Sequence, residues 1–197
     1  MRTIAAALLL ALPPAAFAGA QQYEPLADSV RQRLSAQVSD KAPATVHFQS
    51  AADAQRWLSD MDARLERRLP DRKQRLELLR TVHYEALRAR LDPQLVLGII
   101  EVESGFRKYA VSPAGARGYM QVMPFWIAMI GQPKHNLFHL RINLAYGCAI
   151  LRHYLDLENG DYFRALGRYN GSLGKAEYPN LVLAAWKGRW KYDGPTA

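Results

Sequence analysis

Asp92-Pro93 begins and Gly105 ends an apolar segment, and these boundaries constrain the fold more than any other feature of the sequence. Asp is a favoured N-cap, Pro is favoured at the first helical position, and Gly is favoured directly after a helix. The segment 93–104 is therefore predicted to be a helix.

Similar punctuation marks helices along the rest of the chain. Ser50 and Asp161 are candidate N-caps, and Pro70-Asp71 separates two amphipathic stretches. Few stretches alternate with a period of two, so the predicted class is mainly α. The further predicted helices span 24–38, 51–69, 72–91, 125–130, 140–157, 162–169 and 179–190, with a short extended piece at 47–48.

The first residues have the layout of a secretory signal peptide. Arg2 precedes an apolar run, and small residues surround a candidate cut after Ala18 or Ala20. The run is shorter than a bilayer core of about 30 Å requires, so we expect export without a stable membrane anchor. Residues 1–18 are assigned to the signal peptide, 19–70 to an N-terminal helical extension, and 71–197 to a compact domain. No chemistry is assigned to the extension.

Glu103 occupies an unusual place in the helix 93–104. Leu95, Val96, Ile99 and Ile100 gather on one side, and Glu103 falls within that apolar stripe. Glu101 lies about 160° away around the same helix. A buried glutamate is expected to have a raised pKa, which suits a general acid in glycosidic cleavage. The alternative is a helix-end glutamate that emerges into solvent.

The sequence after Glu103 resembles the SLT-type, family 1 lytic transglycosylases, which have a goose-type-lysozyme-like fold. The matching features are ordered along 72–190: Glu103-Ser104, the stretch 112–124, Asn143, Tyr169-Asn170 and Tyr178. Two positions depart from the family pattern. Tyr119 replaces the usual Leu, and only residues 171–177 separate Asn170 from Tyr178, where the family commonly has a longer loop.

The resemblance implies a lysozyme-like helical domain and a role for each matching residue. Glu103 would be the catalytic acid/base. Tyr169 and Tyr178 would line the cleft and orient the glutamate. The implied substrate-binding residues are Ser112, Gln121, Met123, Tyr169, Asn170 and Tyr178. For Met120, a core position is the preferred interpretation.

The resemblance also implies a reaction with one carboxylate. Ordinary glycosidases place two carboxylates beside the bond. Here the helix geometry removes Glu101 as a partner, and only its nearness to Tyr178 recommends Glu177. Glu103 would protonate the bond between N-acetylmuramic acid and N-acetylglucosamine. It would then accept the proton of the muramic C6 hydroxyl as a 1,6-anhydro ring forms. A muramidase that hydrolyses the same bond, and a peptidoglycan-binding module without catalysis, remain alternatives.

Other chemistries have weaker support. Cys148 follows the apolar period of its helix, which indicates a buried thiol rather than a nucleophile, and His83 falls on an apolar stripe typical of a satisfied core histidine. His135 and His139 have i, i+4 spacing but no acidic third ligand nearby. Neither a metal nor a cofactor is predicted.

The charge of the chain fits an anionic partner. Its formal net charge is +8, and exported basic proteins suit the carboxylate-rich bacterial wall. Nucleic acid is the rival partner, and the signal peptide argues against it. We therefore expect a periplasmic monomer that acts on peptidoglycan glycan strands. Service to a secretion or wall-remodelling complex stays open, as do general wall turnover and endo- or exo-action. Glu103→Gln is expected to abolish wall lysis with the fold intact, and Glu101→Gln to do neither.

Overall fold

A computed structural model describes residues 21–39, 42 and 44–195 of the chain. The predicted signal peptide, residues 1–18, lies outside the described residues. The described part is mainly helical, which confirms the predicted class. Its helices are α1 (Asp28–Val38), α2 (Ala51–Leu65), α3 (Arg72–Arg88), α4 (Pro93–Ser104), α5 (Phe125–Ile130), α6 (Leu140–Leu157), α7 (Tyr162–Asn170) and α8 (Glu177–Lys187).

The helix starts that carry a side-chain cap agree with their predicted positions. Asp92 accepts a hydrogen bond from the Gln94 backbone N–H at 2.7 Å, and Gly105 ends α4 in the left-handed conformation, with φ 56°. The prediction for α4 is therefore confirmed at both ends. By contrast, α1 begins at Asp28 rather than at residue 24, and Ala27, which precedes it, has no side chain that could cap the helix. The extended piece predicted at 47–48 is irregular backbone.

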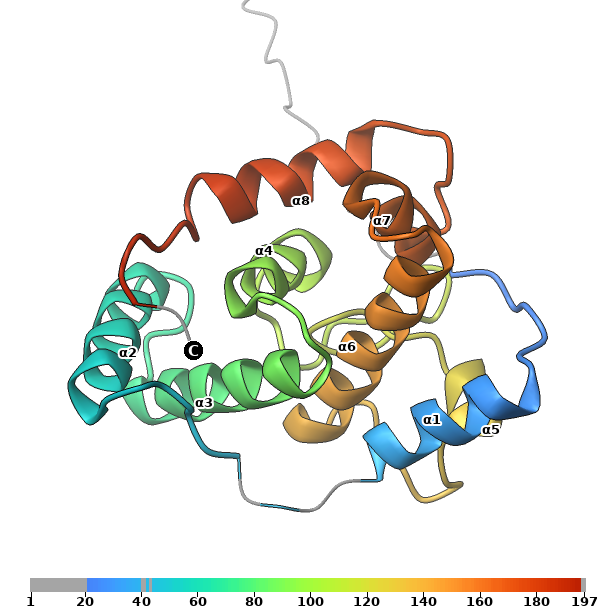
Figure 1. Ribbon diagram of the computed structural model, residues 1–197, viewed down its shortest axis with the longest axis horizontal. Helices are drawn as coiled ribbons and strands as arrows, with labels where there is room; N and C mark the ends of the chain where they lie inside the picture. Colours follow the sequence, from blue (N-terminus) through green and yellow to red (C-terminus); the bar gives the residue numbers. More distant parts are fainter. Residues whose placement is uncertain (1–20, 40–41, 43, 196–197) are drawn as a thin grey trace, which may run out of the picture.

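Helix α4 lies at the centre of the molecule, between α8 and α3 (Figure 1). Its contact with α8 is close, because a Cβ atom at Gly98 would lie only 3.2 Å from the Trp186 backbone nitrogen. Most of its apolar side chains are fully buried, on every side of the helix. This central position fixes the end of α4, and therefore Glu103, relative to the surrounding helices.

The N-terminal extension packs on the same core as the rest of the chain. Leu34 of α1 and Trp57, Met61 and Leu65 of α2 are buried in one cluster with residues of α3, α4 and α6. Helix α2 lies beside α3, and α1 lies beside α5 and α6 (Figure 1). None of the described helices combines the length and apolar character that crossing a bilayer would demand.

Candidate active site

Glu103 lies in the last turn of α4 with 2% of its surface exposed. The Tyr178 hydroxyl, from the first turn of α8, donates a hydrogen bond to Glu103 Oε1 at 2.7 Å. Burial, and then the negative charge of Glu103, raises the pKa of Tyr178 well above its ordinary value. Tyr178 is therefore a protonated donor held against the predicted catalytic carboxyl. The alternative of a glutamate that emerges into solvent does not describe this residue.

Tyr169 is the second tyrosine that was expected to orient Glu103, and it makes a different contact. It is fully buried in α7, and its hydroxyl donates to the Met120 carbonyl oxygen at 2.7 Å. Burial, and then the charge of Glu103, raises its pKa well above the ordinary value. Asn170, the last residue of α7, is also buried. Tyr178 therefore contacts Glu103, whereas Tyr169 holds the backbone of the loop 112–124.

The loop 112–124 is held by short backbone pairings rather than by regular structure. Arg117 forms isolated antiparallel bridges with Val111 and with Val122. The Ser112 hydroxyl accepts a hydrogen bond from the Ala116 backbone N–H at 3.0 Å. Ser112 is buried and closes the turn from within, so its hydroxyl already has a structural partner.

Gln121 and Met123 lie further along the same loop. Gln121 has a positive φ of 48° and is almost fully buried. Its Nε2 donates to the carbonyl oxygens of Ala110 (3.1 Å) and Gly118 (2.9 Å), which ties the loop to itself. Met123 is half-buried. Met120 is fully buried, which confirms the core interpretation of that residue.

Asn143 anchors the loop 112–124 through its side-chain amide. This fully buried side chain of α6 accepts a hydrogen bond from the Met120 backbone N–H at 2.8 Å. Its Nδ2 donates to the carbonyl oxygens of Arg117 and Leu137 at 2.8 and 2.9 Å. The sequence pattern included Asn143 without a role, and the structure makes it the anchor of the loop that carries Gln121.

Gln21 also holds the end of the loop 112–124, a role that the sequence analysis did not predict. Its Oε1 accepts hydrogen bonds from the Met123 backbone N–H at 3.3 Å and from Trp126 Nε1 at 3.0 Å. Because Gln21 and Trp126 are 105 positions apart, no local pattern could indicate this contact.

Glu101 lies on the opposite side of α4 from Glu103, as the helix geometry predicts. Its carboxylate pairs with Arg68 at 2.8 Å and with Arg189, and it accepts from Trp190 Nε1 at 2.6 Å. Glu101 therefore joins the turn after α2 and the C-terminal segment to α4. The sequence did not indicate this structural role.

The remaining candidate residues, Cys148, His135 and Glu177, have surroundings typical of ordinary core or surface residues. Cys148 is fully buried, and burial raises the pKa of its thiol, which confirms the core interpretation. His135 Nδ1 lies 2.8 Å from the Tyr146 hydroxyl. Glu177 is exposed at the start of α8. Within the described ranges, no three His, Cys, Asp or Glu side chains form a group that could hold a metal ion.

Comparison with known proteins agrees with this arrangement. The family model described as the Transglycosylase SLT domain matches residues 80–180. The match spans α4, the loop 112–124, α6, α7 and the Tyr178 end of α8. No solved structure matches the chain significantly.

Three relatives illustrate the similarity. The Transglycosylase of Enterobacteria phage PRD1 is 33% identical over 115 residues, which cover 55% of this chain and 42% of that protein. The Membrane-bound lytic murein transglycosylase C of Histophilus somni (strain 2336) is 37% identical over 100 residues, 43% of this chain and 28% of that protein. Its namesake in Actinobacillus pleuropneumoniae serotype 5b (strain L20) is 52% identical over 52 residues, 26% of this chain and 13% of that protein. The chain thus spans less than half the length of these relatives. On the family match, which covers about half of it, this chain belongs to the SLT transglycosylase family.

Proposed function

We propose that this chain is a peptidoglycan lytic transglycosylase with Glu103 as its single acid/base. The observation that carries the proposal is the buried Glu103 carboxyl with the Tyr178 hydroxyl 2.7 Å away. A carboxyl group removed from water is held as a neutral acid more easily than an exposed one. A neutral carboxylic acid is the form that can protonate a glycosidic oxygen.

The positions of Glu101 and Glu177 favour one carboxylate over two. Glycosidases that use water place a second carboxylate roughly 5–9.5 Å from the acid. Glu101 is engaged by Arg68, Arg189 and Trp190 on the other face of α4, and Glu177 is exposed. Neither side chain is arranged to activate a water molecule beside Glu103.

The proposed reaction balances without water. Glu103 gives its proton to the oxygen between N-acetylmuramic acid and N-acetylglucosamine, and the bond from that oxygen to the muramic C1 breaks. The muramic C6 oxygen then bonds to C1, and its proton passes to the Glu103 carboxylate. Glu103 ends the cycle protonated, and the product is a 1,6-anhydromuramic end. Tyr178 keeps the carboxyl oriented through both steps because its hydroxyl donates to Oε1.

The loop residues are proposed to bind the glycan around Glu103. Gln121 and Met123 lie on the loop that Asn143 and Tyr169 fix in place. We propose Ser112, Gln121, Met123, Tyr169, Asn170 and Tyr178 as the substrate-binding set. The internal hydrogen bonds of Ser112 and Gln121 support a rigid loop whose backbone and remaining polar atoms meet the sugar.

We further propose that the chain acts in the periplasm as a monomer, after export directed by residues 1–18. The two lytic murein transglycosylase C relatives are named as membrane-bound. Fractionation of cells that produce the full chain tests the location, because the processed protein should leave the cell with the periplasmic contents.

Digestion of purified sacculi in ¹⁸O-labelled water tests the reaction. Mass spectrometry should find 1,6-anhydromuropeptides without ¹⁸O at the muramic C1. A muramidase would instead give reducing ends that carry the label, and a binding module without catalysis would release no fragments. Either result would overturn the proposed reaction.

A further inference from the structure

A pocket at the opposite end of α4 from Glu103 has no role in the proposed reaction. Its volume is about 260 Å³, and it is lined by α2, α3, the first residues of α4 and the C-terminal segment. Gln94 lies nine residues before Glu103, so the pocket is about 14 Å away along the helix axis. The lining residues used below are Phe48, Trp57, His83, Asp92, Gln94 and Tyr192.

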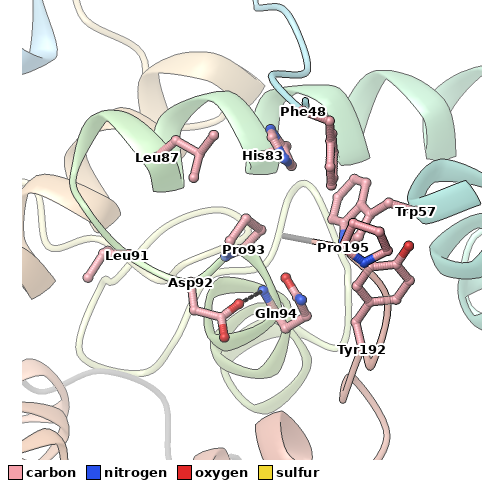
Figure 2. Close-up of a pocket in the computed structure, with 10 residues that line it drawn as sticks. All are labelled: Phe48, Trp57, His83, Leu87, Leu91, Asp92, Pro93, Gln94, Tyr192 and Pro195. Carbon is pink, nitrogen blue, oxygen red and sulfur yellow. Dashed lines mark hydrogen bonds between the residues drawn. The ribbon is translucent and has the colours of Figure 1, made fainter. Parts of the chain in front are cut away.

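Two buried polar atoms in this pocket have no hydrogen-bond partner in the described structure. They are His83 Nδ1 and Gln94 Oε1, and the two residues are 1% and 6% exposed. Figure 2 shows both side chains directed into the space between α3 and the first turn of α4. Unpaired buried polar atoms cost stability and are rare in native proteins, so their presence together in one pocket points to a ligand that pairs with them.

The walls of the pocket are aromatic. Phe48 stacks on His83 with ring centroids 4.7 Å apart, and Trp57 meets His83 edge-on at 5.0 Å. Tyr192 of the C-terminal segment also lines the space (Figure 2). Aromatic faces of this kind pack against the apolar C–H faces of a sugar ring, while the polar atoms bind its substituents.

The electrostatics of the pocket favour a neutral ligand. Burial lowers the pKa of His83 to about 4, so the imidazole is uncharged near neutral pH. Among the described lining residues, only Asp92 is charged, and it would repel an anion. Asp92 itself is occupied, because it accepts from the Gln94 backbone N–H and from Trp186 Nε1.

We propose that this pocket binds an N-acetylglucosamine residue of the glycan strand, as a second glycan site outside the catalytic centre. This inference rests on the proposed function, which makes peptidoglycan the partner. An acetamido N–H would donate to Gln94 Oε1, and a sugar hydroxyl would pair with His83 Nδ1. N-acetylmuramic acid carries a lactyl carboxylate, which the uncharged imidazole does not neutralise and Asp92 disfavours. A second site on the strand would raise the effective concentration of the wall at Glu103.

The binding test uses the full mature chain and N-acetylglucosamine or chitotriose as probes. With ¹⁵N-labelled histidine, the His83 ring signal should shift on titration, among the five histidines of the chain. The Glu103→Gln variant should show the same shift, because the pocket is separate from the catalytic carboxyl. N-acetylmuramic acid should bind at least about tenfold more weakly.

Gln94→Met and His83→Phe distinguish a ligand site from a structural one. Each removes an unpaired polar atom while keeping the side chain's bulk, so the ligand-free variant should melt at the same temperature as the native chain or higher. Each should nevertheless weaken chitotriose binding about tenfold. Lower melting temperatures with unchanged binding would overturn the inference.

The remaining outcomes also decide the question. The inference would be overturned if neither probe shifted the His83 signal. It would also be overturned if Glu103→Gln abolished the shift. Failure of the proposed function is seen separately, because sacculi would then give no anhydro products whether or not chitotriose binds. Gln94→Met should lower the retention of the protein on sacculi while its turnover of short soluble glycan strands stays native.

Discussion

The Tyr178 hydroxyl donates a hydrogen bond to Glu103 Oε1 at 2.7 Å, and both side chains are buried. The contact joins the last turn of α4 to the first turn of α8, two helices that pack closely together. It places a donor that stays protonated beside the carboxyl group that, in the proposed reaction, gives up a proton and takes one back. The orientation of Glu103 thus depends on the packing of two helices.

Tyr178→Phe should slow the reaction without unfolding the protein. The phenyl ring fills the same space, and only the hydrogen bond to Glu103 is lost. A hydrogen bond to a charged group contributes about 1.5–3 kcal/mol, so kcat on sacculi should fall about 10- to 100-fold. A native kcat for this variant would show that Tyr178 does not position the glutamate.

Glu101→Gln should lower stability and leave activity in place. The substitution removes the charge that pairs with Arg68 and Arg189 while keeping an oxygen that can accept from Trp190. Because both arginines are partly exposed, the loss should be about 1 kcal/mol, which lowers the melting temperature by about 2–4 °C. Calorimetry and wall lysis check the two parts separately. Loss of lysis in a folded variant would assign Glu101 to the reaction.

Gly118→Ala should disrupt the loop that carries Gln121. Gly118 has a φ of 76°, and a Cβ atom there would lie 2.5 Å from Asn143 Nδ2 and from the Leu137 carbonyl oxygen. Both the conformation and the close contact require glycine. We expect a destabilisation of at least about 2 kcal/mol and loss of lysis. Gly115 has a φ of 89° with no heavy atom within 4 Å of its added Cβ, so Gly115→Ala is a control for the conformational part alone.

His83 should make stability depend on pH in the acid range. Burial lowers its pKa from 6.5 to about 4 in the folded protein, so between these values the unfolded chain binds more protons at this residue. The free energy of unfolding should therefore fall as the pH drops from about 6.5 to 4, by on the order of 3 kcal/mol from this residue. In His83→Phe, denaturant titrations should show this part of the slope removed. An unchanged slope would contradict the assignment to His83.

The sequence predicted those parts of the structure that depend on local chemistry. Asp92, Pro93 and Gly105 set the ends of α4 by capping, and the helical period placed Glu101 and Glu103 on different faces. The order of motifs after Glu103 indicated which loop would follow it. At α1, which has no capping side chain at Ala27, the predicted start was wrong by several residues.

Contacts between distant residues could not be predicted in this way. Gln21 reaches Trp126 across 105 positions, and Glu101 meets Trp190 across 89. His83 fits the core pattern that its sequence stripe predicted, yet the prediction of a satisfied histidine was wrong for Nδ1. Among the described residues that atom has no partner, where α2, α3 and the C-terminal segment meet around the pocket, and no local pattern encodes this.

Product analysis of two matched variants tests the central claim most directly. Glu103→Gln and Glu177→Gln each replace a carboxyl group by an amide, one at the buried residue beside Tyr178 and one at the exposed residue before Tyr178. Purified sacculi should yield 1,6-anhydromuropeptides with the native chain and with Glu177→Gln. With Glu103→Gln, which should remain folded, the yield should fall by at least about 10²-fold. Release of anhydro products by Glu103→Gln at the native rate would contradict the assignment of Glu103 as the acid/base.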